Sequence, residues 1–194
     1  MEEYLMGNFI LLNTPRLTLR DHRMEDLESY HRLFSDAQTM YYLDDLQTKT
    51  MEESTASLMQ AIEEISKTDR TKYFLRIQSR ETAVHIGEIG YYIKELTPLG
   101  TCVEMGYFIY PSFWGKGYVT EAAQALMEYA FEENGVWRIT AGCISGNRGS
   151  ERVMQKCGMR KEGEYQQCVW HDGAMRKRVS YGLLKSEWQN KSQY

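Results

Sequence analysis

The spacing of apolar residues indicates a strand followed by two helices in the first third of the chain. Residues 16–23, "RLTLRDHR", alternate apolar and polar positions, which predicts an edge strand. Segments 24–36 and 51–66 each place their apolar residues on one helical face, which predicts two amphipathic helices. The predicted face of the first has Met24, Leu27, Tyr30 or His31, and Phe34; that of the second has Leu58, Met59, Ile62 and Ile65. The stretch between them, 37–49, has neither period and is predicted to be a loop.

The pattern changes to a strand period after Lys72. Three β-rich segments separated by turn residues predict an antiparallel meander: 72–78, 84–96 and 102–110. A helix from about Thr120 to Asn134, ended by Gly135, a strand at 136–144, and a short helix at 150–157, ended by Gly158, follow. Two final strands flank Asp172-Gly173, a strong hairpin signal. The alternation predicts one mixed α/β domain, 1–194, built on a single sheet.

Composition and charge narrow the class of protein. The chain has 194 residues, 42% hydrophobic and 26% charged, which is ordinary for a globular domain. Four cysteines without CxxC spacing and four scattered histidines favour a reduced, cytoplasmic protein without a metal. The acidic N-terminus, "MEEYLMGNFILL", is a poor signal peptide, and no apolar run approaches the roughly 20 residues of a membrane helix. The first 70 residues carry 14 acidic and 7 basic side chains, which argues against nucleic acid as a partner.

Residues 111–121, "PSFWGKGYVTE", carry the strongest chemical signal. Gly115 and Gly117 permit a sharp turn directly before a helix, whose first N–H groups and dipole attract an anion, and Lys116 adds a cation. A nucleotide P-loop would need Ser or Thr after the lysine, and a dinucleotide loop would need a third glycine. Two interpretations of the loop remain: a binding site for the pyrophosphate of coenzyme A, or a glycine turn that binds no ligand.

Four motifs in order resemble the GNAT superfamily of acyl-CoA-dependent N-acyltransferases, and most closely its RimJ/RimL branch of ribosomal-protein-alanine acetyltransferases. "WGKGYVTEA" (114–122) is similar to the family's Q/R-x-x-G-x-G/A pyrophosphate loop, with Trp114 and Val119 at substituted positions. "VEMGYFIYP" (103–111) resembles the fourth strand, and "NRGSERVMQKCGM" (147–159) an N-x-x-S-x-R-V-x-x-K-x-G-F element. "YGLLKSEW" (181–188) resembles the closing strand, so the likeness covers nearly the whole chain.

The resemblance implies a fold and a cofactor. The fold is a bent, mostly antiparallel mixed sheet of about seven strands with about four helices, splayed between the fourth and fifth strands to admit acetyl-CoA. The implied cofactor contacts are Phe108, Ile109, Trp114, Gly115, Lys116, Gly117, Tyr118, Val119, Thr120, Asn147 and Ser150. Phe108 and Ile109 could equally be core residues, and Asn147 could cap a helix.

The resemblance also implies catalytic roles. Glu104 is the preferred base or water-ordering carboxylate, with Glu88 in reserve, and a salt-bridged strand glutamate is the alternative. The tyrosine that protonates the thiolate in many relatives is replaced by Met154, so Ser150 is the candidate donor, or else a helix cap. The catalytic glutamate of RimL-like proteins would fall near Val169 and is missing.

The implied reaction is direct attack of an amine on the thioester of acetyl-CoA in a ternary complex. A protein or peptide N-terminus is the expected acceptor, and a polyamine, aminoglycoside or amino acid is the alternative. The alternative outside the enzyme class is a protein that binds acyl-CoA as a sensor without catalysis. The resemblance is also compatible with a homodimer. The acceptor is expected at the first two helices and their loop, 24–66, and at the Asp172-Gly173 hairpin. Acidic residues in segment 24–66 could attract a cationic acceptor: Glu25, Asp26, Glu28, Asp44, Asp45, Glu52 and Glu53. Tyr41 and Tyr42 could form an apolar wall.

Overall fold

A computed structural model describes residues 9–191. Most of segment 1–12, which was predicted not to be a signal peptide, lies outside the described residues. The strands are β1 (Leu11–Asn13), β2 (Leu17–Arg20), β3 (Lys72–Ser79), β4 (His85–Thr97), β5 (Gly100–Ile109), β6 (Val136–Ile144), β7 (Arg160–His171) and β8 (Ala174–Leu184). The helices are α2 (Leu27–Phe34), α3 (Met51–Ile65), α4 (Tyr118–Glu132), α5 (Arg148–Lys156) and α6 (Lys185–Lys191), with three short 3-10 helices, η1 (Met24–Asp26), η2 (Asp44–Leu46) and η3 (Pro111–Phe113). The predicted order of elements is confirmed, and β1 and α6 are added to it.

The strands within residues 9–191 form one eight-stranded mixed sheet in the order β1-β2-β3-β4-β5-β6-β8-β7. About seven strands were predicted, and β1 is the additional one. Because β1 pairs antiparallel with β2 from Leu11↔Arg20 to Asn13↔Thr18, the prediction that residues 16–23 form an edge strand is wrong. Strand β5 pairs parallel with β6 as far as Glu104↔Thr140.

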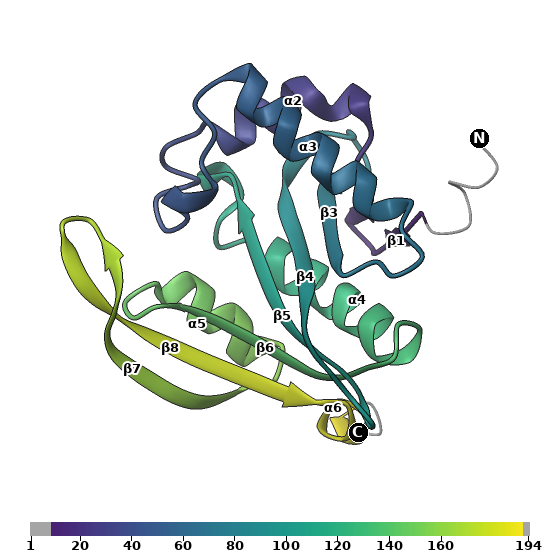
Figure 1. The fold of residues 1–194 in the computed structure, drawn as a ribbon, viewed down its shortest axis with the longest axis vertical. Coiled ribbons are helices and arrows are strands. Elements are labelled where there is room, and N and C mark those ends of the chain that lie inside the picture. Colours follow the sequence, from purple (N-terminus) through teal and green to yellow (C-terminus); the bar gives the residue numbers. More distant parts are fainter. Residues whose placement is uncertain (1–8, 192–194) are drawn as a thin grey trace. The chain divides into compact units, whose positions relative to one another are not determined.

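The chain groups into two compact units, and β4, β5 and α4 each continue from one into the other. The first unit comprises the described part of Met1–Tyr91 together with Tyr107–Ala122. In it, α2 and α3 lie side by side (Figure 1), and their buried residues form a core with Met40. The helical faces differ in detail from the predicted ones, because Met24 and Met59 are exposed whereas Leu33 is fully buried.

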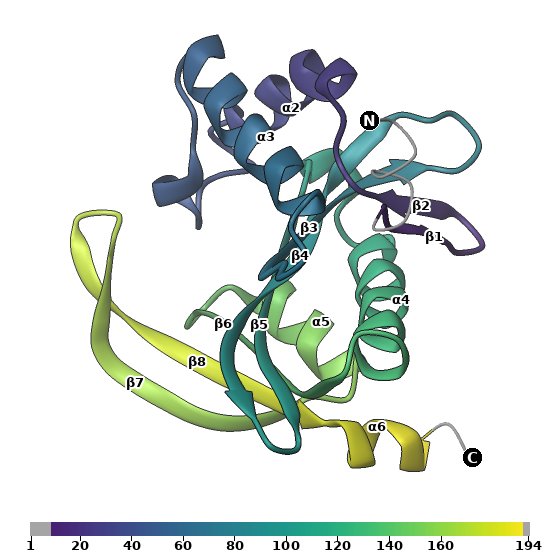
Figure 2. The same ribbon diagram turned by 45° about the vertical axis from the view of Figure 1, so that its right-hand side comes forward.

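The second unit comprises Tyr92–Gly106 and Ala123–Tyr194. Its β7–β8 hairpin is long and curved (Figure 2), and β8 pairs antiparallel with β6 from Arg138↔Leu184 to Ile144↔Arg178. The predicted hairpin turn is confirmed, since Asp172 and Gly173 both have positive φ, 49° and 68°. The predicted glycine stops are also found: Gly135 and Gly158 follow α4 and α5 with φ of 62° and 81°.

Candidate active site

The loop between β5 and α4 has the geometry of an anion site. Gly115 and Gly117 have φ of 72° and 80°. Among the described residues, a Cβ at Gly115 would meet no atom within 4 Å, and one at Gly117 would meet only Arg16 Nη2 at 3.6 Å. Backbone conformation rather than crowding therefore explains both glycines. Glu121 N–H donates to the Gly117 carbonyl at 3.0 Å, so α4 begins directly after the loop and directs its first-turn amides towards it.

Arg16 and Glu121 fasten this loop to the start of β2, a contact that the sequence pattern does not reveal. Glu121 Oε1 accepts from Thr14 Oγ1 at 2.6 Å and from Arg16 N–H at 2.9 Å, and its Oε2 accepts from Arg16 Nε at 2.6 Å. Partial burial favours the neutral carboxyl, but the hydrogen bonds from Thr14 and Arg16 outweigh it and lower the pKa of Glu121. Glu121 is thus an ionised anchor at the N-terminus of α4.

The end of β5 is held by core packing and by an indole. Phe108 is partly buried against the α2–α3 core, with its ring 5.1 Å from that of Phe34, and Ile109 is buried. Trp114 Nε1 donates to the Ile109 carbonyl at 3.0 Å. Val119 is buried as well, so only its backbone is available for the role implied by the resemblance.

Glu104 lies on β5, and two cations of the second unit hold its carboxylate. Lys94 Nζ donates to Oε2 at 2.9 Å, and Arg178 donates to Oε1. Burial raises the pKa of Glu104, but these hydrogen bonds and charges outweigh it, so the net shift is downward. The group is therefore a stabilised carboxylate, better suited to hold a water molecule or a positive charge than to take up a proton.

Glu104 also lines a cavity of about 350 Å³ within the second unit. The other charged residues in its wall are Lys94, Arg138, Glu162 and Arg178, and Arg138 is ion-paired with Glu162. Three cationic and two carboxylate side chains, that of Glu104 included, thus line the cavity.

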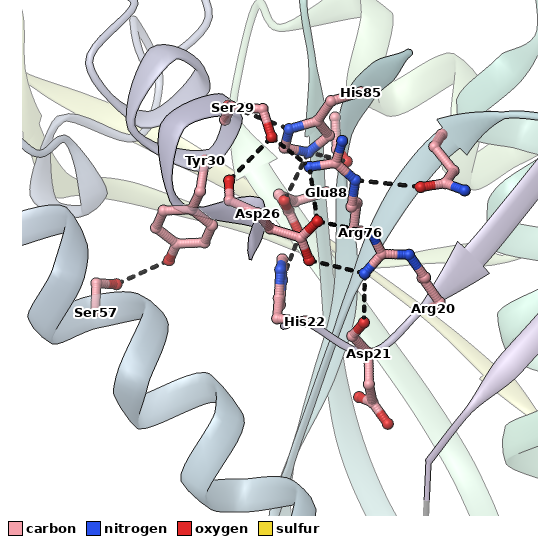
Figure 3. Close-up of polar contacts among 12 residues, drawn as sticks. Arg20, Asp21, His22, Asp26, Ser29, Tyr30, Ser57, Arg76, His85 and Glu88 are labelled. Atoms are coloured by element: carbon pink, nitrogen blue, oxygen red, sulfur yellow. Dashed lines mark hydrogen bonds and ion pairs between the residues drawn. The ribbon is translucent and has the colours of Figure 1, made fainter. Parts of the chain in front are cut away.

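Glu88, the reserve candidate, is a core residue of the first unit and is 5% exposed. Figure 3 shows its carboxylate between two imidazoles: His22 Nε2 is 3.0 Å from Oε2, and His85 Nε2 is 2.8 Å from Oε1. Burial raises the pKa of Glu88, and attraction to His22 with hydrogen bonds from both histidines lowers it further than burial raises it. This carboxylate is enclosed in the core, and we assign it a structural role.

A second buried carboxylate, Asp26, lies in the same network (Figure 3). Arg20 donates to both of its oxygens, at 2.7 and 2.6 Å, and Arg76 Nη1 is 3.6 Å from Oδ1. Asp26 is 5% exposed, so its placement among surface acids for a cationic acceptor is wrong. The sequence does not reveal this, because a carboxylate in a buried ion pair and a solvated carboxylate look the same in a sequence.

Asn147 and Ser150 lie at the start of α5 in the second unit. Asn147 Oδ1 accepts from the Ser150 N–H at 3.1 Å, so Asn147 is the N-cap. The Ser150 hydroxyl hydrogen-bonds the Cys143 thiol, whose burial raises its pKa to about 11 despite this bond. Met154, at the position of the family's tyrosine, is fully buried.

The segment 24–66 presents an exposed surface with aromatic and acidic side chains. Tyr41 and Tyr42 are 48% and 38% exposed and contact each other edge to face at 4.8 Å. The exposed acidic residues are Glu25, Glu28, Asp44, Asp45, Glu52, Glu53 and Glu63. Glu53 closes the capping box of α3 with Thr50 and so has a structural partner.

Comparison with known proteins identifies the family. Residues 16–160 match the model described as Acetyltransferase (GNAT) domain. The chain therefore belongs to the GNAT family, and it is an acetyl-CoA-dependent acyltransferase. It is 32% identical over 179 residues to the uncharacterised N-acetyltransferase YnaD of Bacillus subtilis, covering 91% of this chain and 98% of YnaD.

Solved structures show the same fold. RimL, a ribosomal L7/L12 α-N-protein acetyltransferase in complex with coenzyme A, is similar with a TM-score of 0.82 at 19% identity, over 92% of this chain and 99% of RimL. Spermidine N-acetyltransferase from Vibrio cholerae, in complex with CoA and spermine, is similar with a TM-score of 0.78 at 19% identity, over 91% and 100% of the two chains. One neighbour acts on a protein N-terminus and the other on a polyamine.

Two kinds of feature are absent from residues 9–191. Within this range, no helix is long and apolar enough to cross a membrane. The same residues contain no group of three or more His, Cys, Asp or Glu side chains placed to hold a metal ion.

Proposed function

We propose that this enzyme transfers the acetyl group of acetyl-CoA to the α-amine of a protein or peptide N-terminus, by direct attack in a ternary complex, and that residues 1–194 act as one domain. The loop 114–117 carries the cofactor part of this proposal. Its two glycines with positive φ and the N-terminus of the 15-residue helix α4 form the kind of backbone cradle that binds phosphates.

The proposed cofactor contacts lie in the loop before α4, at the end of β5 and at the start of α5. In the first unit, we assign the pyrophosphate to backbone amides of Gly115–Thr120 with Trp114 and Lys116 at the edge, and the pantetheine arm to the backbone at Phe108 and Ile109. In the second unit, Asn147 and Ser150 are proposed cofactor contacts. The occupied side-chain oxygen of Asn147 leaves its NH₂ group for this role.

The catalytic proposal follows from the state of Glu104. Its two cationic partners keep it ionised, which favours ordering of a water molecule or of the incoming amine over proton abstraction. Ser150 is the proposed proton donor to the departing thiolate. Its hydroxyl is not needed for the helix cap, because Asn147 supplies that oxygen.

The weak basicity of Glu104 is also the observation that favours an N-terminal acceptor. An α-amine with a pKa near 8 is about one-tenth neutral at pH 7, whereas a lysine-like amine near 10.4 is neutral in roughly one molecule in 2,500. An enzyme without a strong base therefore suits the α-amine. A polyamine is the second candidate, because the exposed acidic residues of segment 24–66 could attract it.

The acceptor test compares three substrates at equal concentration: a peptide with a free N-terminus and no lysine, the same peptide N-terminally blocked with one lysine added, and spermidine. We expect acetyl-CoA-dependent product from the first alone, with kcat/KM rising with pH to a plateau above about pH 8 as the amine loses its proton. Turnover of spermidine without turnover of the free peptide would contradict the N-terminal assignment and leave the acetyltransferase assignment intact.

Glu104→Gln tests the proposed water-ordering role. Because the carboxylate does not take the proton, we expect kcat to fall by about tenfold, the Kd for acetyl-CoA to stay constant, and the pH profile to keep its midpoint. Glu162→Gln, which changes another ion-paired carboxylate of the same cavity, is the control. A fall in kcat of about a thousandfold, the size expected for loss of a general base, would contradict this role.

A further inference from the structure

Arg16 contacts the proposed pyrophosphate loop and the first turn of α4 with three parts of its guanidinium group. Its Nε donates to Glu121 at 2.6 Å, its Nη1 donates to the Lys116 carbonyl at 3.0 Å, and its guanidinium carbon lies 4.4 Å from the centre of the Tyr118 ring. An exposed ion pair alone contributes little to stability. The planar guanidinium, however, is fixed here by a carboxylate, a carbonyl and a ring at once.

The hydrogen bond from Arg16 to the Lys116 carbonyl also fixes the direction of the Gly117 N–H, which belongs to the same peptide group. In a trans peptide the C=O of one residue and the N–H of the next point in opposite directions, and no described residue of this chain has a cis peptide. A guanidinium that holds the Lys116 carbonyl therefore turns the Gly117 N–H away from Arg16. That N–H lies in the segment proposed to meet the pyrophosphate.

We propose that Arg16 is a positioning residue, which orients the Lys116–Gly117 peptide so that the Gly117 N–H can donate to the cofactor's pyrophosphate. Glu121 anchors the guanidinium, and Thr14 and the Arg16 backbone anchor Glu121. This inference rests on the proposed function of the loop.

Charge alone predicts a different outcome from positioning. Glu121 is a negative charge in the first turn of α4, where it opposes a bound anion. If only charge mattered, Glu121→Gln would tighten cofactor binding, and Arg16→Lys would bind like the unchanged protein. If positioning matters, both variants bind more weakly, because lysine has no planar fork and the amide holds Arg16 less firmly.

The first experiment needs no cofactor. We expect the NMR order parameter of the Gly117 amide to fall in Arg16→Met and to stay unchanged in the control Arg160→Met, which removes an exposed arginine paired with Glu187. An unchanged Gly117 amide in Arg16→Met would overturn the inference, whatever the protein binds.

The second experiment measures cofactor binding and turnover. We expect Arg16→Met to raise the Kd for CoA by roughly tenfold, Arg16→Lys and Glu121→Gln to raise it as well, and the KM for S-acetyl-pantetheine, which lacks a pyrophosphate, to stay constant. An unchanged Kd in Arg16→Met or tighter binding by Glu121→Gln would overturn the inference. Failure of the unchanged protein to bind CoA would instead overturn the proposed function of the loop. The NMR order parameter of the Gly117 amide would still show whether Arg16 orients the Lys116–Gly117 peptide.

Discussion

Replacement of Gly117 by valine is expected to raise the Kd for acetyl-CoA by at least about a hundredfold. Gly117 has a φ of 80°, a conformation that a β-branched residue rarely adopts. The valine would therefore shift the loop to a negative φ, and the amides of residues 115–120 would no longer converge. The Cβ alone would make only an ordinary contact with Arg16 Nη2, at 3.6 Å, so strain in the backbone causes the expected loss. Titration calorimetry of the purified variant measures this loss.

Two further substitutions bracket the Gly117 result. Gly163→Ala is the control, because its new Cβ would make only ordinary contacts, at 3.8 Å, with the Tyr165 ring. Gly115→Ala should fall between the two, because φ is 72° but alanine is less restricted than valine. Circular dichroism must show that each variant is folded. If a folded Gly117→Val variant retains the original affinity for acetyl-CoA, the loop has no part in cofactor binding.

Glu88→Gln is expected to destabilise the folded protein by about 3 kcal/mol, which is typical for loss of one partner from a buried ion pair. His85 Nδ1 lies 3.2 Å from the Ser29 carbonyl, and its Nε2 faces both Glu88 and the Gly87 carbonyl. The glutamine would remove the carboxylate charge from this enclosed network and could place an amide N–H donor where a carboxylate oxygen now meets a ring nitrogen. Urea unfolding measures the change, with the exposed Glu81→Gln as control.

The same carboxylate makes stability depend on pH in the acid range. Because the folded-state pKa of Glu88 lies below its ordinary value of 4.5, the ionised carboxylate favours the folded state above that pH. This contribution is lost as the pH falls below about 4.5 towards the folded-state pKa. We expect Glu88→Gln to flatten the acid limb of the stability curve. Equal stability and an equal acid limb in variant and parent would show that the network contributes nothing net.

Local signals in the sequence predicted most of the elements correctly. Strand 136–144 was predicted as a buried strand with the bounds of β6, since Gly135 precedes it and most of its residues are apolar. Strand β1 was missed because three residues, Leu11–Asn13, are too few to show a period. The exposed Met59 occupies a helical apolar position that α3 does not use, which a one-dimensional pattern cannot reveal.

The candidate site was predictable only where its residues are neighbours in sequence. The glycines of the loop and the Asn147 cap follow from local rules on positive φ and helix ends. Arg16 lies about a hundred positions before the loop, so no local pattern connects them. The pairing of Glu104 with Arg178 is likewise a contact between distant strands. It makes Glu104 a salt-bridged carboxylate and favours the water-ordering role over that of a base.

Calorimetric titration of the purified protein with acetyl-CoA shows whether the chain binds the cofactor whose pyrophosphate we assign to residues 114–120. ATP and NAD are the controls, because a general phosphate site would bind them too. We expect micromolar binding of acetyl-CoA and CoA and none of ATP or NAD at the same concentrations. Absence of acetyl-CoA binding, or its competition by ATP, would mean that the glycine loop is a tight turn or a nucleotide site, and the proposed mechanism would fall.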